Sequence, residues 1–312
     1  MRTVGSLHIN EEERQMFKNV VVGIDGEDGG RDALALARLL CADGGRLTLA
    51  HVYPGEAIVW RGANPAYQAV EQEDAEALLE RTRAEEKLDA DTKFIGASSV
   101  GKGLHLLAED IGADLIVIGS SRDGLLHRVM VGDETRAALN GAPSAVAIAP
   151  AGYTTEPHLL RQVGVGYNGS PESEHALAFA RQLAEESGAT LSAFQAVSVP
   201  SYVSHGRTAV DSTPITDLVD EARAQIVALG GVEPHAAYGK PAEELALYSA
   251  SLDLLVVGSR DFGPLGRLVH GSTTHQLAHS AGCPLLVLTR AVRRTDAERP
   301  AGEEPQTALA GS

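Results

Sequence analysis

An internal repeat constrains the fold of this chain more than any other feature of its sequence. Residues 19–40 (NVVVGIDGEDGGRDALALARLL) align with residues 162–183 (QVGVGYNGSPESEHALAFARQL). Each segment has the pattern of a short apolar strand, a glycine turn and a helix with apolar residues three and four apart. Later in each half, residues 113–123 (ADLIVIGSSRD) match residues 252–261 (LDLLVVGSRD). The chain is therefore predicted to fold as two copies of one unit in tandem.

Between these landmarks both halves carry the same further elements, in the order βαβαβαβαβ. The predicted strands lie at 47–52, 92–97 and 144–149 in the first half and at 191–197, 233–237 and 285–288 in the second. The predicted helices lie at 66–87, 102–111, 215–229 and 242–250. Apolar strands that alternate with helices indicate a parallel sheet covered on both faces. We expect an α/β fold of two tandem, doubly wound, five-stranded parallel sheets with strand order 3-2-1-4-5.

The repeat also predicts where the domains begin and end. We expect a first domain at residues 19–150 and a second at residues 161–290, joined by a short linker. Residues 1–18 are then a polar N-terminal extension, and residues 291–312, rich in Pro, Gly and charge, a disordered tail. Like surfaces of duplicated domains tend to pack together, so an approximate two-fold axis is expected between the lobes. The last strand of each lobe is the candidate for a shared edge.

Charge and cysteine content narrow the partners and the compartment. The net charge is −16, the pI is near 5.1, and the densest basic cluster is Arg293–Arg294, so a nucleic acid partner is not expected. No apolar run approaches the length of a membrane span, and the N-terminal residues are too charged for a secretory signal peptide. These features predict a cytoplasmic protein. Cys41 and Cys283, in helix-like or helix-end segments, are expected to be reduced and mostly buried.

Ligands of doubly wound sheets bind at the carboxyl ends of the strands, at the point where the strand order reverses. In each lobe this point lies between strands 1 and 4. After strand 1 the first half carries Asp25, and the second half carries Asn168. A carboxylate here accepts from a ribose hydroxyl, helps to hold a metal ion, or caps the following helix, a role that Asp and Asn fill about equally.

After strand 4 the second half carries two glycine segments, Gly258-Ser259-Arg260 and Gly271-Ser272-Thr273. Glycine lets the backbone approach a ligand, and the N–H groups of a helix N-terminus favour phosphate. Ser272 alone would be read as a helix cap, but its place beside the expected crevice favours a phosphate site. The first half carries Gly119 and Gly132, with Asp133 at the position of Ser272.

With these residues the chain resembles a tandem universal stress protein over nearly all of residues 19–290. The resemblance implies an adenine nucleotide alpha hydrolase-like fold. Nucleotide-binding members of that family carry Asp after strand 1 and the pattern G-x2-G-x9-G-(S/T) after strand 4. The resemblance further implies that the end of strand 2 contacts adenine through its backbone, at Val52 in the first half and Ala196 in the second.

Neither half keeps the complete family pattern. In the second half Gly258, Gly271 and Ser272 match, and Asp261 replaces the middle glycine. In the first half the matching residues are Asp25, Gly119 and Gly132, while Arg122 replaces the middle glycine and Asp133 the hydroxyl residue.

Other site types find no support in the sequence. Residues 23–29 have the wrong spacing for a GxGxxG turn and no such motif begins after Val165, and a Walker A loop and a GxSxG elbow are absent. His275 and His279 are four residues apart on one helix face, near His270, but without a carboxylate or cysteine at ligand spacing we expect a solvated face and no metal site.

These observations predict a cytoplasmic stress-response protein that binds ATP or a related adenine nucleotide, with or without magnesium, as a sensor or switch. Slow ATP hydrolysis is the most that is expected, because no acid–base or nucleophile constellation is present. The alternative is a pseudo-symmetric scaffold or interaction module that binds no nucleotide. The lobes are expected to form an intramolecular pseudo-dimer, which leaves room for further homo-oligomers.

The two lobes are expected to bind unequally, with the nucleotide mainly in the second. Asn168 in place of Asp forfeits a charge-assisted hydrogen bond worth about 1.5–3 kcal/mol. Asp133 instead places a carboxylate where phosphate should bind, and at ~5 Å and an effective dielectric near ~20 it repels each phosphate charge by roughly 3 kcal/mol. It also satisfies the N–H groups that phosphate would use.

Overall fold

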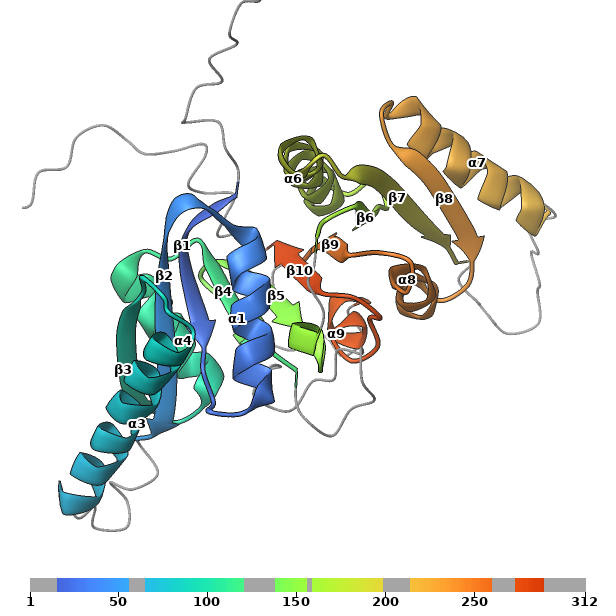
Figure 1. Ribbon diagram of the computed structural model, residues 1–312. Coiled ribbons are helices and arrows are strands. Elements are labelled where there is room, and N and C mark those ends of the chain that lie inside the picture. The colour runs from blue at the N-terminus through green and yellow to red at the C-terminus, as the bar shows by residue number, and fades with distance from the viewer. Residues whose placement is uncertain are drawn as a thin grey trace, which may run out of the picture.

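A single ten-stranded sheet runs through the protein, and its two ends belong to the two halves of the chain (Figure 1). We describe residues 16–55, 65–120, 138–155, 159–198, 214–259 and 273–288 of a computed structural model of the chain. The first half contains β1 (Phe17–Gly23), α1 (Asp28–Leu40), β2 (Cys41–Pro54), α3 (Pro65–Glu85), β3 (Asp91–Ala97), α4 (Val100–Ile111), β4 (Leu115–Gly119) and β5 (Ala145–Ala149). The second contains β6 (Gln162–Gly166), α6 (Pro171–Ser187), β7 (Thr190–Val197), α7 (Ile215–Ala228), β8 (Glu233–Tyr238), α8 (Pro241–Ser249), β9 (Leu254–Gly258), α9 (Thr273–Leu277) and β10 (Leu285–Leu288).

The order of the strands confirms the predicted fold class. The sheet reads β3-β2-β1-β4-β5-β10-β9-β6-β7-β8, which is the order 3-2-1-4-5 followed by its mirror image. Every pair within a half is parallel. The last strands β5 and β10 pair antiparallel, with Val146 opposite Val287, so the predicted shared edge is confirmed.

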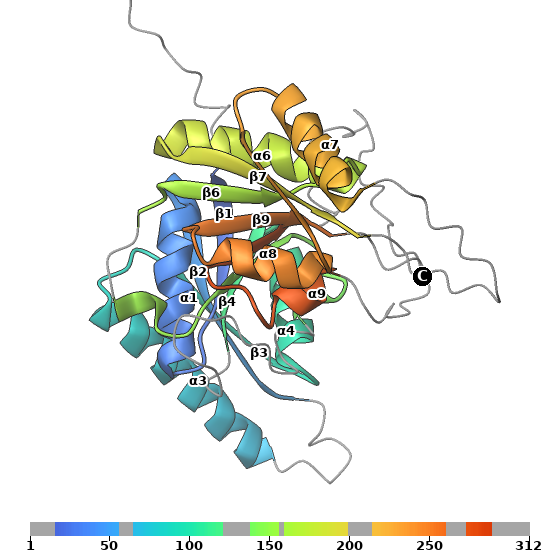
Figure 2. The ribbon, with the colours of Figure 1, turned by 90° about the vertical axis from the view of Figure 1, so that its right-hand side faces the viewer.

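Equivalent helices of the two halves cover the same face of the sheet. One core cluster joins α1, α3, α6 and α7 to the sheet, and it includes the rings of Phe17 and Phe179, whose centroids are 5.2 Å apart. The other cluster joins α4, α8 and α9 to the opposite face, where α8 and α9 lie next to one another (Figure 2). Both clusters contain residues from both halves, so the hydrophobic core continues across the β5–β10 pair.

The repeated aspartate before strand 4 links two strands in each half. The carboxylate of Asp114 accepts from the backbone N–H groups of Lys18 and Asn19, at 2.8 and 3.0 Å. Asp253 accepts in the same way from Arg161 and Gln162, both at 2.8 Å. Burial raises the pKa of the Asp114 carboxyl, against the lowering effect of these hydrogen bonds. The repeated aspartate therefore fixes the start of strand 1 beside strand 4.

Asp32 attaches the connection between the halves to the first half. Its side chain lies on α1 and is 1% exposed. The carboxylate accepts from the N–H groups of Gly152 and Thr154, both at 2.8 Å, and from Thr154 Oγ1 at 3.0 Å. The 3-10 turn at Tyr153–Thr155 is thereby held against α1.

The sequence misplaced the start of the second strand. β2 begins directly after α1 and spans Cys41–Pro54, beyond the predicted 47–52. Cys41 is the C-cap residue of α1, at the helix end that was predicted, as well as the first residue of β2, and it is half-buried. Cys283 lies between α9 and β10 and is buried. Burial raises the pKa of both thiols, with Asp114 a smaller cause at Cys41. Neither cysteine forms a disulfide. Among the described residues, no helix is long and apolar enough to cross a membrane.

Candidate functional site

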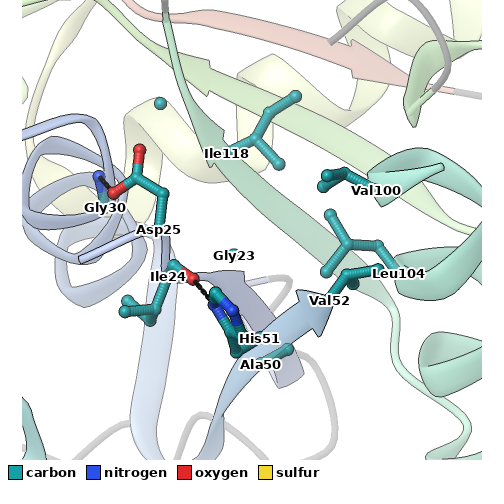
Figure 3. A pocket seen from close by; sticks show the side chains of 11 residues that line it. Gly23, Ile24, Asp25, Gly30, Ala50, His51, Val52, Val100, Leu104 and Ile118 are labelled. Atoms are coloured by element: carbon teal, nitrogen blue, oxygen red, sulfur yellow. Dashed lines mark hydrogen bonds between the residues drawn. The ribbon is translucent and has the colours of Figure 1, made fainter. Parts of the chain in front are cut away.

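A cavity opens at the carboxyl ends of β1, β2 and β4 in the first half, at the point where the strand order reverses (Figure 3). Its volume is about 250 Å³. Aliphatic side chains from β2, α4 and β4 form much of its wall, and Asp25 and His51 are its two titratable residues. The lining residues are Gly23, Ile24, Asp25, Gly30, Ala50, His51, Val52, Val100, Leu104, Ile118 and Gly119.

Asp25 lies in the turn that joins β1 to α1. Its Oδ1 accepts from the N–H groups of Glu27 and Gly30, at 2.8 and 3.0 Å. Figure 3 shows the other carboxylate oxygen pointing away from Gly30. A Cβ on Gly30 would lie 2.8 Å from Oδ1, so the carboxylate reaches the helix backbone only because residue 30 is glycine. Oδ1 of Asp25 thus holds the first turn of α1, and Oδ2 accepts no hydrogen bond from the described residues.

His51 on β2 fixes the same turn from the other side. Its Nδ1 is 2.7 Å from the carbonyl oxygen of Ile24, the residue before Asp25 (Figure 3). A ring nitrogen that faces a carbonyl carries the proton, so Nδ1 donates and Nε2 is left as an acceptor in the neutral ring. Sequence reasoning missed His51. The signal was its place in the chain next to Val52, at the end of strand 2.

The glycines at the end of strand 4 are required by helix packing. A Cβ on Gly119 would lie 2.0 Å from the carbonyl oxygen of Gly29 in α1. A Cβ on Gly258 would lie 2.3 Å from the carbonyl oxygen of Glu172 in α6. These glycines were expected to allow close approach of a ligand, and the structure shows that they allow close approach of the first helical turn.

The equivalent turn of the second half is built differently. Asn168 Oδ1 accepts from the N–H of Ser170 at 3.1 Å. The helix α6 is capped by Ser170 itself, whose Oγ accepts from the N–H of Ser173 at 3.3 Å, and Pro171 occupies its first position. The helix cap considered for this position is therefore made by Ser170, and Asn168 orders the turn before it.

The structure brings three predicted residues together and leaves others apart or outside its range. Asp25, Val52 and Gly119 line the one cavity. In the second half Ala196 lies near the end of β7, Ser259 follows β9, and Thr273 opens the short helix α9. The remaining predicted residues, Gly132, Arg260, Gly271 and Ser272, lie outside the described residues, as does Asp133. The cavity residues that were not predicted as site residues, besides His51, are Gly23, Ile24, Gly30, Ala50, Val100, Leu104 and Ile118.

Titratable side chains do not gather elsewhere into a metal site within the described part of the chain. No three His, Cys, Asp or Glu side chains there come together as metal ligands. His275 and His279 face each other on α9 and the turn after it, with ring centroids 5.1 Å apart, and His270 lies outside the described residues.

Comparison with known proteins places this site in a family. The pattern of the Universal stress protein family matches the chain twice, at residues 16–150 and 160–289. The chain belongs to the universal stress protein family. A universal stress protein of Mycobacterium tuberculosis is 28% identical over 292 residues, which cover 86% of this chain and 96% of that protein.

Solved universal stress proteins share the fold of the whole chain. The structure of one from Archaeoglobus fulgidus has a TM-score of 0.63 at 17% identity and covers 87% of this chain and 96% of its own. The structure of a putative universal stress protein from Pseudomonas aeruginosa has a TM-score of 0.60 at 17% identity and covers 90% and 97%. Both extend over the two halves, so the tandem arrangement is a known form of this fold.

Proposed function

We propose that this universal stress protein binds ATP or a related adenine nucleotide, alone or with magnesium, as a cytoplasmic sensor or switch. Its two domains would be residues 19–150 and 161–290, between the extension 1–18 and the tail 291–312. The observation that carries the proposal is the first-half cavity, in which a carboxylate oxygen of Asp25 stands beside an aliphatic wall.

The chemistry of the cavity suits a nucleoside. Val52, Leu104 and Ile118 offer apolar surface to the faces of a purine. Asp25 offers an acceptor for a ribose hydroxyl, and the family resemblance adds the backbone of Val52 as a partner for the base. At about 250 Å³ the cavity is slightly smaller than common ligand pockets, which span about 300–1,000 Å³. It therefore fits a base and a ribose, with the phosphates extending beyond it.

The same lining argues for binding without fast turnover. Asp25 holds the start of α1 and His51 donates to the carbonyl of Ile24, so both side chains already serve the turn before α1. Among the described residues that line the cavity there is no lysine or arginine to stabilise charge on a transferring phosphoryl group. We propose slow hydrolysis at most.

Calorimetry with ATP, ADP and adenosine, each with and without magnesium, tests the proposal. Asp25→Ala removes a charge-assisted hydrogen bond worth about 1.5–3 kcal/mol and is expected to weaken binding by roughly tenfold or more. Asp28→Ala is the matched control, since this exposed carboxylate lies at the start of α1 and is not among the described residues that line the cavity. If none of the three ligands binds the wild-type protein at millimolar concentration, the proposal is wrong.

The second candidate function is a scaffold that binds no nucleotide. It is favoured by the continuous sheet, in which the β5–β10 pair and the Asp32 contacts hold the halves in one arrangement. The calorimetry separates the two functions, because a scaffold would leave all three ligands unbound.

A further inference from the structure

The two halves differ at one core position beside the cavity. In the first half Ala50 on β2 lies opposite Gly23 on β1 and lines the cavity. The pairing of β6 with β7 places Phe194 opposite Gly166, at the equivalent position of the second half. An alanine next to the site in one half is thus a phenylalanine in the other.

The surroundings of the two positions match. A Cβ on Gly23 would meet Ile118 and Leu104, which line the cavity. A Cβ on Gly166 would meet the corresponding side chains, Val257 and Leu245. Phe194 is 7% exposed and belongs to the same core cluster as Val257 and Leu245. The side chain of Phe194 therefore extends from the position at which the first half has its open cavity.

Neighbouring aromatic rings hold Phe194 in position. Its ring stacks on Tyr248 of α8, with centroids 4.9 Å apart and planes at 27°. Tyr248 also contacts the ring of His235, at 5.5 Å, and its hydroxyl is hydrogen-bonded to Ser192. In the first half the positions of Phe194 and His235 carry Ala50 and Lys93. A stacked and buried ring has few rotamers to move into, so it does not swing aside for a ligand.

We infer that Phe194 closes the base pocket of the second half, so that the chain binds one nucleoside, in the first half, and that residues 50 and 194 decide this. The inference rests on the proposed function and gives it a place and a stoichiometry. It places the base in the first half. The residues expected to face the phosphates, Asp133 and Ser272, favoured the second half in the sequence, and they lie outside the described part of the chain.

Methyl NMR of the full chain, with labelled Ile, Leu and Val, tests the inference with two probes. Adenosine reports on nucleoside binding, and indole reports on room for a planar ring without ribose or phosphate. In the wild-type protein both probes are expected to shift the methyl signals of Ile118 and Leu104 and to leave those of Val257 and Leu245 unchanged. Phe194→Ala is expected to add shifts at Val257 and Leu245 and to raise the adenosine stoichiometry from one to two.

Two further variants keep the test decisive. Ala50→Phe is expected to weaken adenosine binding at least tenfold, by filling the first-half pocket. Phe194→Leu, which retains bulk at that position, is the matched control and is expected to leave the second half closed. If Phe194→Ala is shown by its thermal melt not to fold, the wild-type methyl map and Ala50→Phe decide.

The outcomes separate the inference from the proposed function. Shifts with indole in the expected pattern, without any adenosine binding, would reject nucleotide binding and support the difference in space. Wild-type shifts at Val257 or Leu245, no new shifts in folded Phe194→Ala, or no shift at Ile118 and Leu104 with either probe would overturn the inference.

Discussion

The turns that start α1 and α6 come from one repeat, yet they satisfy the helix by different means. In the first half the Asp25 carboxylate reaches across the turn to the N–H of Gly30. In the second half Ser170 caps its own helix and Asn168 bonds back to the N–H of Ser170. The backbone path is preserved while the chemistry that supports it has changed. A helix start thus has more than one solution, and only the first leaves a carboxylate beside the cavity.

The comparison separates residues of the fold from residues of the site. Both halves keep glycine at 119 and 258, and aspartate at 114 and 253, and in each half these residues make the same backbone contacts. The halves differ at Asp25 and Asn168, and at Ala50 and Phe194, and in the first half Asp25 and Ala50 line the cavity. The residues that both halves keep hold the sheet together, whereas these residues, which differ, lie at or opposite the position of the cavity.

The largest expected effect is a loss of stability, and we expect it to be equal in both halves. Gly119→Ala and Gly258→Ala each push a Cβ into a backbone carbonyl, and we expect each to lower the free energy of unfolding by roughly 3 kcal/mol or more. Urea denaturation measures this. A Gly258→Ala protein of wild-type stability that has lost nucleotide binding would show that the glycine serves the ligand instead.

A slightly smaller loss in the free energy of unfolding is expected when Asp32 is substituted. The second half has no equivalent aspartate, because His175 occupies that position. Asp32→Ala leaves two backbone N–H groups and a hydroxyl without their acceptor, and should cost about 2–3 kcal/mol. Asp32→Asn retains one acceptor and should cost less. Asp28→Ala, at an exposed position of the same helix, is the control, with an expected change within about 0.5 kcal/mol. Equal losses for the alanine variants at 28 and 32 would contradict the role of the buried carboxylate.

The next effect, on ATP binding, is expected at Asp133 and Ser272, the residues predicted to face the phosphates. Asp133→Ser removes a repulsion of roughly 3 kcal/mol per phosphate charge and should strengthen ATP binding at least tenfold. Adenosine binding should barely change, because adenosine carries no phosphate. Ser272→Asp should leave adenosine binding intact if the base binds in the first half. If calorimetry shows that Ser272→Asp abolishes the binding of both ATP and adenosine, the nucleotide site lies in the second half.

The smallest effect distinguishes the two helix starts. Ser170→Ala removes the side-chain cap of α6 and should cost about 1 kcal/mol. The N-cap residue of α1, Glu27, makes no side-chain cap hydrogen bond, so Glu27→Ala should change stability by less than about 0.5 kcal/mol. Thermal melts of both variants are sufficient to compare them. Equal losses would mean that the two starts are capped alike.

The sequence predicted the parts of the structure that the repeat itself encodes. Strand order, the two parallel half-sheets and the edge shared by β5 and β10 followed from apolar patterns and from the rule that like surfaces pack together. Asp25 and Gly119 line one cavity, where the carboxyl ends of neighbouring parallel strands were expected to meet, and Val52, to which the family resemblance pointed, lines it too.

What the sequence did not predict depends on contacts between distant residues. The sequence did not indicate a partner for His51, because the carbonyl that it meets belongs to Ile24, in the turn after β1. Gly119 was assigned to a ligand because the helix that approaches it is far away along the chain. Phe194 looked like an ordinary core residue, and its meaning appeared only when strand pairing placed it opposite Gly166.

The antiparallel pair of β5 and β10 also decides how the halves find each other. Halves made as separate chains would meet in proportion to their concentration, and two kinds would sort into three pairings, two of them between identical copies. In one chain the short linker supplies an effective concentration on the order of millimolar at any dilution. The first half then always pairs with the second half of the same chain. Joined in this way, one half is free to lose a ligand contact without ever being paired with its own copy.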